Sequence, residues 1–274
     1  MPADLHIHTT ISDGTHTPEE VVRLAKEAGL KTIAITDHDI IDGVERAIEA
    51  GQKAGVEVIP GVEFTTESPK AEIHILGYFI DRNDPEFLAA LEKVQQGRVK
   101  RIYKIVEKLN SLGVDLSAEE VLAIAGNKAP GRPHVARALL KKGVVANFKD
   151  AFNRFLDSRS PAYVPHYKLT PTEAIKLISA AGGLPVFAHP LISNADGMIA
   201  EFAGIGLKGI EVYYPGYRPE VIGHYLELAR KMGLCVTGGT DFHGEGSGRE
   251  IKLGELTIAD ELVDKLKNEH LHRN

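Results

Sequence analysis

The chain has 274 residues, of which 43% are hydrophobic and 26% are charged. This composition is ordinary for a globular protein, and it excludes disordered, collagen-like and coiled-coil chains. A single cysteine, Cys235, excludes an intrachain disulfide and any metal site with several cysteine ligands. We find neither an apolar run of membrane-spanning length nor a secretory signal, so we expect a cytoplasmic protein with no membrane contact.

The net charge of −6 is unevenly distributed along the chain. Residues 93–168 carry fifteen Lys and Arg against six Asp and Glu, a balance of +9, so the remaining residues together carry −15. This asymmetry predicts that the basic segment meets an anion and that the acidic remainder holds cations. A chance run of solvated lysines is the alternative explanation.

Strand and helix signals alternate in the first 80 residues and again after residue 169. In chain order we expect strands over residues 3–8, 31–36, 56–64 and 71–80, with helices over 18–28 and 44–54. In the second half we expect strands over 184–188, 209–213 and 234–237, and helices over 171–181, 199–203, 218–232 and from residue 260. Such alternation favours parallel βαβ units.

The middle of the chain has a different pattern, because residues 81–162 carry no strand signal. We expect helices over residues 85–112, 118–125, 132–142 and 148–156. The sequence therefore predicts a barrel-forming part, residues 1–92 and 169–274, and a basic helical insertion, residues 93–168, that acts as a lid over the substrate.

Histidines and carboxylates gather near the ends of the predicted strands. The set comprises His6, His8, Asp13, His38, Glu63, His74, His189, Asp241 and His243. The carboxyl ends of barrel strands carry the active site in folds of alternating strands and helices. A lone strand histidine is more often a core residue. The whole set, with imidazole and carboxylate donors and no thiolate, predicts a site for two or three divalent transition-metal ions.

The motifs around these residues resemble those of the polymerase-and-histidinol-phosphatase (PHP) family. They are Asp4-Leu5-His6-Ile7-His8 with Ser12-Asp13-Gly14, Thr36-Asp37-His38-Asp39, Gly61-Val62-Glu63, His74-Ile75-Leu76-Gly77-Tyr78, Phe187-Ala188-His189-Pro190 and Gly239-Thr240-Asp241-Phe242-His243. The resemblance implies an α/β fold, a distorted (β/α)₇ barrel with the helical insertion, and a trinuclear centre of Mn²⁺, Fe²⁺ or Zn²⁺. It implies three ligand sets: His6, His8, Glu63 and Asp241; Asp13, His38 and His243; and Glu63, His74 and His189.

Clustered divalent ions suit phosphoester hydrolysis, because ions about 3.5–4 Å apart can share a bridging hydroxide and stabilise both the attacking and the leaving oxygen. Arg132 opens a predicted helix, where an anion is favoured, and Arg159 is a second phosphate-binding candidate. His134 is a candidate phosphate ligand or acid. Surface salt bridges explain the two arginines equally well without the resemblance. We expect Arg137, Lys141 and Lys142 on a solvated helix face.

The segments Gly131-Arg132-Pro133-His134-Val135-Ala136-Arg137 and Pro161-Ala162-Tyr163-Val164 resemble the insertion of one PHP subgroup. That subgroup removes the 3′-phosphate from nucleoside 3′,5′-bisphosphates or trims short 5′-phosphorylated RNA from its 5′ end. The resemblance implies that Arg132, His134 and Arg159 hold the 5′-phosphate. Two alternatives stay open. One is a histidinol-phosphate phosphatase or another small-molecule phosphatase. The other is a non-catalytic, metal-bound regulatory or nucleic-acid-binding module.

Overall fold

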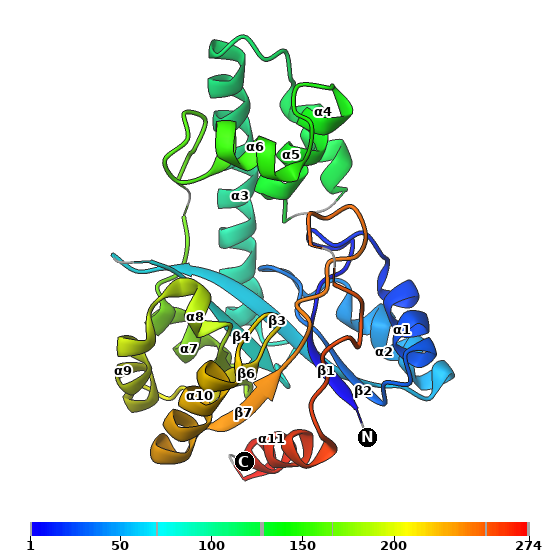
Figure 1. The fold of residues 1–274 in the computed structure, drawn as a ribbon, viewed down its shortest axis with the longest axis vertical. Helices are drawn as coiled ribbons and strands as arrows, with labels where there is room; N and C mark the ends of the chain where they lie inside the picture. Colours follow the sequence, from blue (N-terminus) through cyan, green and yellow to red (C-terminus); the bar gives the residue numbers. More distant parts are fainter. Residues whose placement is uncertain (1, 70, 127–128, 166, 250, 273–274) are drawn as a thin grey trace.

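A computed structural model describes residues 2–69, 71–126, 129–165, 167–249 and 251–272. Its centre is one seven-stranded sheet whose strands follow one another in chain order (Figure 1). The strands are β1 (Ala3–Ile7), β2 (Thr32–Ile35), β3 (Glu57–Glu67), β4 (Glu72–Tyr78), β5 (Leu184–Phe187), β6 (Gly209–Tyr213) and β7 (Cys235–Gly238). Every strand predicted from the sequence is present, with its ends shifted by only a few residues.

The sheet curls into a nearly closed barrel. The amide of His8 donates to the carbonyl of Phe242 at 2.9 Å, and the amide of Phe242 donates to the carbonyl of His6 at 3.3 Å. These bonds join the end of β1 to the segment after β7. Gly239 permits this approach, since a Cβ at that position would lie 2.4 Å from the amide nitrogen of His6. The expected distorted (β/α)₇ barrel with a helical insertion is confirmed.

One strand departs from the parallel arrangement that the alternation predicts. β4 runs antiparallel to both β3 and β5, whereas the other neighbouring strands pair in parallel. Only residues 68–71 join β3 to β4, and a parallel crossover needs about a dozen residues or more. The first residues of β4 consequently lie beside the carboxyl ends of the parallel strands.

Helices cover the outside of the barrel. They are α1 (Pro18–Glu27), α2 (Val44–Ala54), α7 (Pro171–Ala180), α8 (Pro190–Ser193), the 3₁₀ turn η2 (Asp196–Met198), α9 (Ile199–Gly204) and α10 (Pro219–Met232), while α11 (Asp260–Leu271) lies at the end opposite the insertion (Figure 1). The main apolar core lies between sheet and helices and includes Ile35, Phe64, Phe187, Phe202 and Tyr225. No helix among the described residues is both long and apolar enough to cross a membrane.

The insertion stands above the barrel on one long helix, α3 (Pro85–Ser111) (Figure 1). The first half of α3 packs in the barrel core through Phe87, Leu91 and Val94. Its second half belongs to a separate apolar cluster with α4 (Ala118–Ala125), α5 (Arg132–Lys141), α6 (Phe148–Ala151) and the π-helical turn η1 (Phe152–Leu156). The helix expected over residues 148–156 is present, and it changes from α-helix to a π-helical turn after Ala151. Residue 93, the expected start of the lid, falls inside a continuous helix.

Arg98 ties α3 to the loop that follows β2. Its Nε donates to Oδ2 of Asp39 at 2.7 Å, and its Nη2 contacts the same carboxylate and donates to the hydroxyl of Thr65 at 3.0 Å. Both Arg98 and Asp39 are buried. Burial raises the pKa of Asp39, and the guanidinium of Arg98 opposes this effect. The ion pair therefore keeps a carboxylate inside the protein next to His38.

Replacing this guanidinium tests its contribution to stability. Arg98→Ala leaves the buried carboxylate of Asp39 without its cation, so we expect the free energy of unfolding to fall by about 3–5 kcal/mol. Urea titration followed by circular dichroism measures it. The control is Arg23→Ala, which breaks an exposed pair with Glu27 and should cost about 1 kcal/mol or less. Equal losses for the two variants would contradict a special role for the buried pair.

Candidate metal centre

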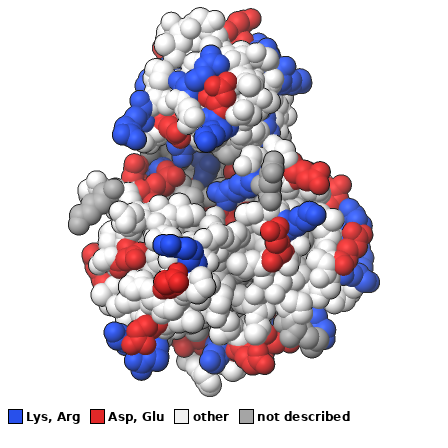
Figure 2. All heavy atoms as spheres, in the orientation of Figure 1, with Lys and Arg blue, Asp and Glu red and all other residues white. Residues whose placement is uncertain are grey.

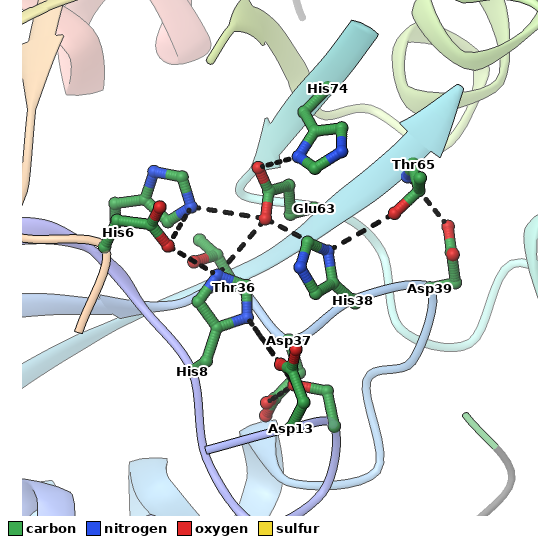
Figure 3. Close-up of polar contacts among 12 residues, drawn as sticks. His6, His8, Asp13, Thr36, Asp37, His38, Asp39, Glu63, Thr65 and His74 are labelled. Atoms are coloured by element: carbon green, nitrogen blue, oxygen red, sulfur yellow. Dashed lines mark hydrogen bonds and ion pairs between the residues drawn. The ribbon is translucent and has the colours of Figure 1, made fainter. Parts of the chain in front are cut away.

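The histidines and carboxylates predicted from the sequence lie together at the carboxyl end of the barrel, and Figure 3 labels six of them: His6, His8, Asp13, His38, Glu63 and His74. Residues that follow β1, β2, β5 and β7 are His8, Asp13, His38, His189, Asp241 and His243. His6 and Glu63 come from within β1 and β3. His74 is the third residue of β4, and the antiparallel direction of this strand brings it to the same end of the barrel.

Glu63 lies at the centre of the cluster (Figure 3). Imidazole nitrogens of five histidines lie within 3.3 Å of its carboxylate oxygens: those of His6, His8, His38, His74 and His189. Burial alone would raise the pKa of the Glu63 carboxyl, but His38, His6 and His74 hold it well below its ordinary value. A carboxylate surrounded in this way is suited to bridge cations.

Three groups of side chains have donor atoms close enough to hold an ion. In each group these atoms lie within 4.8 Å of one another: His6, His8, Glu63 and Asp241; His8, Asp13, His38 and His243; and His38, Glu63 and His74. The first group equals one ligand set implied by the family resemblance, and the second contains another. His189 stands outside the third group, although its Nε2 lies 3.1 Å from Oε1 of Glu63.

The hydrogen bonds on the outer side of the cluster leave donor atoms facing inward. Nδ1 of His6 lies 2.9 Å from Oε1 of Glu211, so it donates there and turns Nε2 toward Glu63. Nε2 of His6, Nε2 of His8 and Oδ1 of Asp241 are buried, and none makes a well-oriented hydrogen bond with the described residues. Because buried polar atoms without partners are costly, their convergence fits a divalent cation.

The surroundings of His6 favour a proton on its imidazole, at the place where a metal ion would bind. Although burial opposes it, the carboxylates of Glu211 and Glu63 raise the pKa of His6 to about 10. Burial lowers the pKa of neighbouring His8 to about 4. The two carboxylates thus favour the charged form of His6, whereas burial favours the neutral form of His8. A metal ion would displace that proton when it binds.

Glu211 is a residue of the site that the sequence analysis missed. It lies in β6 and is completely buried. Its Oε1 holds Nδ1 of His6, and its Oε2 accepts from the amide of His189 at 2.8 Å. The same carboxylate thereby orients two candidate ligands. The available signal was one glutamate between Ile210 and Val212 in an otherwise apolar strand.

Two further buried aspartates fix the loops that carry candidate ligands. Asp37 accepts from the amide and the hydroxyl of Thr9, both at 2.7 Å, and contacts the hydroxyl of Ser12, next to Asp13. Asp4 accepts from the amide of Thr240 at 2.9 Å and from its hydroxyl at 2.6 Å, next to Asp241. Burial raises the pKa of Asp37, and it raises that of Asp4 to about 6.

The surface is hollowed where the insertion meets the barrel, and side chains of both charges line this hollow (Figure 2). Arg132 and Tyr163 of the insertion line a pocket of about 390 Å³ together with Glu72 of β4. Nη2 of Arg132 lies 3.3 Å from Oε1 of Glu72. The same oxygen lies 3.6 Å from Nε2 of His74, and Oε2 of Glu72 contacts Nζ of Lys168. Against the effect of burial, His74, Lys168 and Arg132 hold the pKa of Glu72 well below its ordinary value.

The other predicted residues of the insertion occupy different surroundings. His134 is buried, its Nδ1 accepts from the amide of Gly131 at 3.0 Å, and it is bonded to the backbone of Ser12. Burial lowers its pKa to about 4. Both ring nitrogens are therefore engaged, and a role as acid or phosphate ligand requires one bond to break. Arg159 is exposed, outside the side chains that line the Arg132 pocket.

Arg137 does not lie on a solvated helix face, so that expectation is wrong for this residue, whereas Lys141 and Lys142 are exposed. Nη2 of Arg137 donates to the backbone carbonyl of Asp13 at 2.6 Å. This bond and the contact of His134 with Ser12 join α5 to the loop after β1, which carries the candidate ligand Asp13. The periodicity of α5 could not reveal them, since both partners lie more than a hundred residues away.

Glu211→Gln tests the orienting role of this carboxylate. The change removes the charge behind His6 while keeping the side-chain shape, so we expect metal affinity to fall about 10- to 100-fold. Calorimetric titration with Mn²⁺ measures this loss, and thermal unfolding shows whether the fold persists. Glu201→Gln, an exposed position on α9, is the matched control. If Glu211→Gln binds Mn²⁺ as tightly as the control, Glu211 does not support the metal centre.

Comparisons with known proteins agree with this geometry. The PHP domain family model matches residues 4–160. A 5′-3′ exoribonuclease of Haemophilus influenzae is 34% identical over 88% of this chain and 89% of its own length. A 3′,5′-nucleoside bisphosphate phosphatase of Chromobacterium violaceum is 31% identical over 89% of this chain and 88% of its own length.

The solved structures include a close relative of the fold. A protein of Bifidobacterium adolescentis described as a metal-dependent phosphoesterase superposes with a TM-score of 0.89 at 33% identity, over 96% of this chain and 94% of its own. The family match and the named relatives point to the same family as the barrel and its cluster of metal-binding side chains. The chain belongs to the PHP domain family of metal-dependent phosphoesterases.

Proposed function

We propose that this protein hydrolyses the 3′-phosphate of nucleoside 3′,5′-bisphosphates and trims short 5′-phosphorylated RNA from its 5′ end. The observation that carries the proposal is the carboxylate of Glu63 among five imidazoles, directly below a basic insertion. The cluster offers donors for two or three ions of Mn²⁺, Fe²⁺ or Zn²⁺. Its ligands would be the nine residues named from the sequence.

The barrel would hold the catalytic metal ions, and the insertion would bind the substrate. Bound divalent ions would supply an activated water and neutralise the negative charge of the attacked phosphate. Glu63 would bridge the ions. Glu211 would hold the ring of His6 and the backbone of His189 in place. Residues 93–168 would act as the lid. Arg132 would grip the 5′-phosphate with two parallel hydrogen bonds after exchanging Glu72 for it.

The lid residues do not contribute equally to this proposal. Arg132 is half-buried and pairs with the carboxylate of Glu72, the kind of partner that a phosphate would replace. Arg159 is exposed nearby, where it would reach the phosphate only after moving. His134 would chiefly fix α5 against the loop of Asp13. The names of the two relatives support a nucleotide or RNA substrate, and both activities attack the phosphoester next to a 5′-phosphorylated nucleotide.

A product assay separates this function from its alternatives. Mn²⁺-loaded protein is incubated with adenosine 3′,5′-bisphosphate, a 5′-phosphorylated RNA trimer and histidinol phosphate, and products are separated by chromatography. We expect 5′-AMP from the bisphosphate, and loss of the reaction when a chelator removes the metal. Turnover of histidinol phosphate alone would overturn the substrate assignment. Failure to hydrolyse any phosphoester would favour the non-catalytic module.

Arg132→Ala tests the phosphate-binding role. The variant loses a charge-assisted bond to the 5′-phosphate, so kcat/KM for adenosine 3′,5′-bisphosphate should fall about 10- to 100-fold. Hydrolysis of p-nitrophenyl phosphate, which lacks a second phosphate, should change little. Arg230→Ala, on the exposed face of α10, serves as control. Equal losses on both substrates would remove Arg132 from substrate recognition.

A further inference from the structure

A second basic surface lies on the insertion helix, outside the Arg132 pocket. We propose that this surface binds the sugar-phosphate chain of single-stranded RNA beyond its 5′-terminal nucleotides. It is a groove of about 430 Å³ along α3, which we call the α3 groove, and it is lined mainly by Lys93, Lys100, Arg101, Lys104, Pro165 and Tyr167. The inference rests on the proposed function, because it assigns a longer substrate to the same site.

The charge of the α3 groove suits a polyanion. Four of its lining residues are cations, and no carboxylate lines it among the described residues. Lys93, Gly97, Lys100 and Lys104 recur at helical spacing, so they share one face of α3 over about 16 Å. Lys100 and Lys104 are exposed, and neither forms an ion pair within the described part of the chain.

Arg101 links the groove to the proposed phosphate pocket. It is 5% exposed, and its Nε donates to the carbonyl of Val164 at 2.6 Å. Its Nη2 is buried without a hydrogen-bond partner among the described residues. The guanidinium lies 5.4 Å from the ring centre of Tyr163, which lines the Arg132 pocket. A phosphate of the strand that leaves the metal centre on its 3′ side would supply the acceptor that Nη2 lacks.

Tyr167 gives the groove an aromatic surface. Its side chain is 40% exposed, and Nζ of Lys93 lies 4.3 Å from its ring centre. Gly97 lets this residue lie directly against α3, since a Cβ there would come 3.3 Å from Cβ of Tyr167. Cations that follow a backbone next to an exposed aromatic ring are the usual features of single-strand binding.

The number of charges favours RNA over a mononucleotide in this groove. A nucleoside bisphosphate carries two phosphates, and the metal centre and Arg132 account for both in the proposed function. Lys93, Lys100 and Lys104 are further cations of the groove, which additional phosphates would neutralise. A longer 5′-phosphorylated strand supplies such phosphates on the 3′ side of the attacked one, whereas both phosphates of a bisphosphate are already bound. The groove would therefore distinguish RNA from mononucleotides.

Direct binding tests the groove without catalysis. Full-length protein in chelator is titrated into fluorescein-labelled 5′-phosphorylated decauridylate, and anisotropy is followed at several salt concentrations. Lys100→Ala/Lys104→Ala should bind about ten-fold more weakly at low salt. The slope of log affinity against log salt should become shallower by about 1.4, from about 0.7 per lost phosphate contact. The charge-matched control, Lys26→Ala/Lys53→Ala on α1 and α2, should bind like wild type. Equal binding by the two double variants would overturn the proposal.

Tyr167 is tested separately from charge. Tyr167→Ala should weaken decauridylate binding at least about five-fold through lost stacking, and Tyr167→Phe should restore it. A Tyr167→Ala variant that binds like wild type would remove the stacking surface from the proposal.

Turnover by the Mn²⁺-loaded protein distinguishes failure of the groove from failure of the proposed function. For Lys100→Ala/Lys104→Ala, KM for the decamer should rise about ten-fold, while adenosine 3′,5′-bisphosphate is hydrolysed as by wild type. If wild type hydrolyses neither substrate, the proposed function fails, and the binding arm alone decides on the groove. If wild type hydrolyses both and the variant matches it on both, only the groove proposal fails.

Discussion

The buried carboxylate of Glu63 imposes the constraint on which the rest of the structure depends. It faces five imidazoles, and such a concentration of donors is stable only when protons or cations balance the charge. Glu211, Asp4 and Asp37 lie behind it and hold rings and loops in position. Asp39, His189 and Asp241 have φ values of +54°, +28° and +51°. These strained backbone conformations persist because the hydrogen bonds around the cluster hold them in place.

The barrel is shaped to assemble this cluster from distant parts of the chain. Closure between β1 and the segment after β7 brings His6 and His8 next to Asp241, over 230 residues away in sequence. Reversal of β4 brings His74 to the edge occupied by the ends of the parallel strands. An all-parallel barrel would place the first residues of that strand at the opposite end. The antiparallel β4 is therefore part of how the site is built.

The sequence was most informative where chemistry and spacing coincide. His6 and His8, two residues apart in a strand, and the Asp241–His243 pair stand out because core positions rarely carry such groups in series. The direction of β4 was legible in the six residues, 65–70, between the two predicted strands, since a parallel crossover needs about a dozen, but the alternation outweighed that signal. Glu211 was missed because a single carboxylate within a strand has no partner in sequence. The bonds of Arg137 and His134 to the loop after β1 were out of reach for the same reason, since they depend on how the insertion docks.

Helix α3 connects the cluster to the surfaces that would select a substrate. Arg98 on its buried face holds Asp39, the residue after His38, and Lys100 and Lys104 lie on its exposed face. Arg101, between them, reaches the segment that leads to Tyr163 and the Arg132 pocket. The same helix therefore contacts the candidate metal centre, the Arg132 pocket and the groove proposed to bind RNA. Because α3 packs in both apolar clusters, the fold fixes the position of the insertion relative to the barrel, and the bond from Arg137 to the loop of Asp13 fixes it a second time.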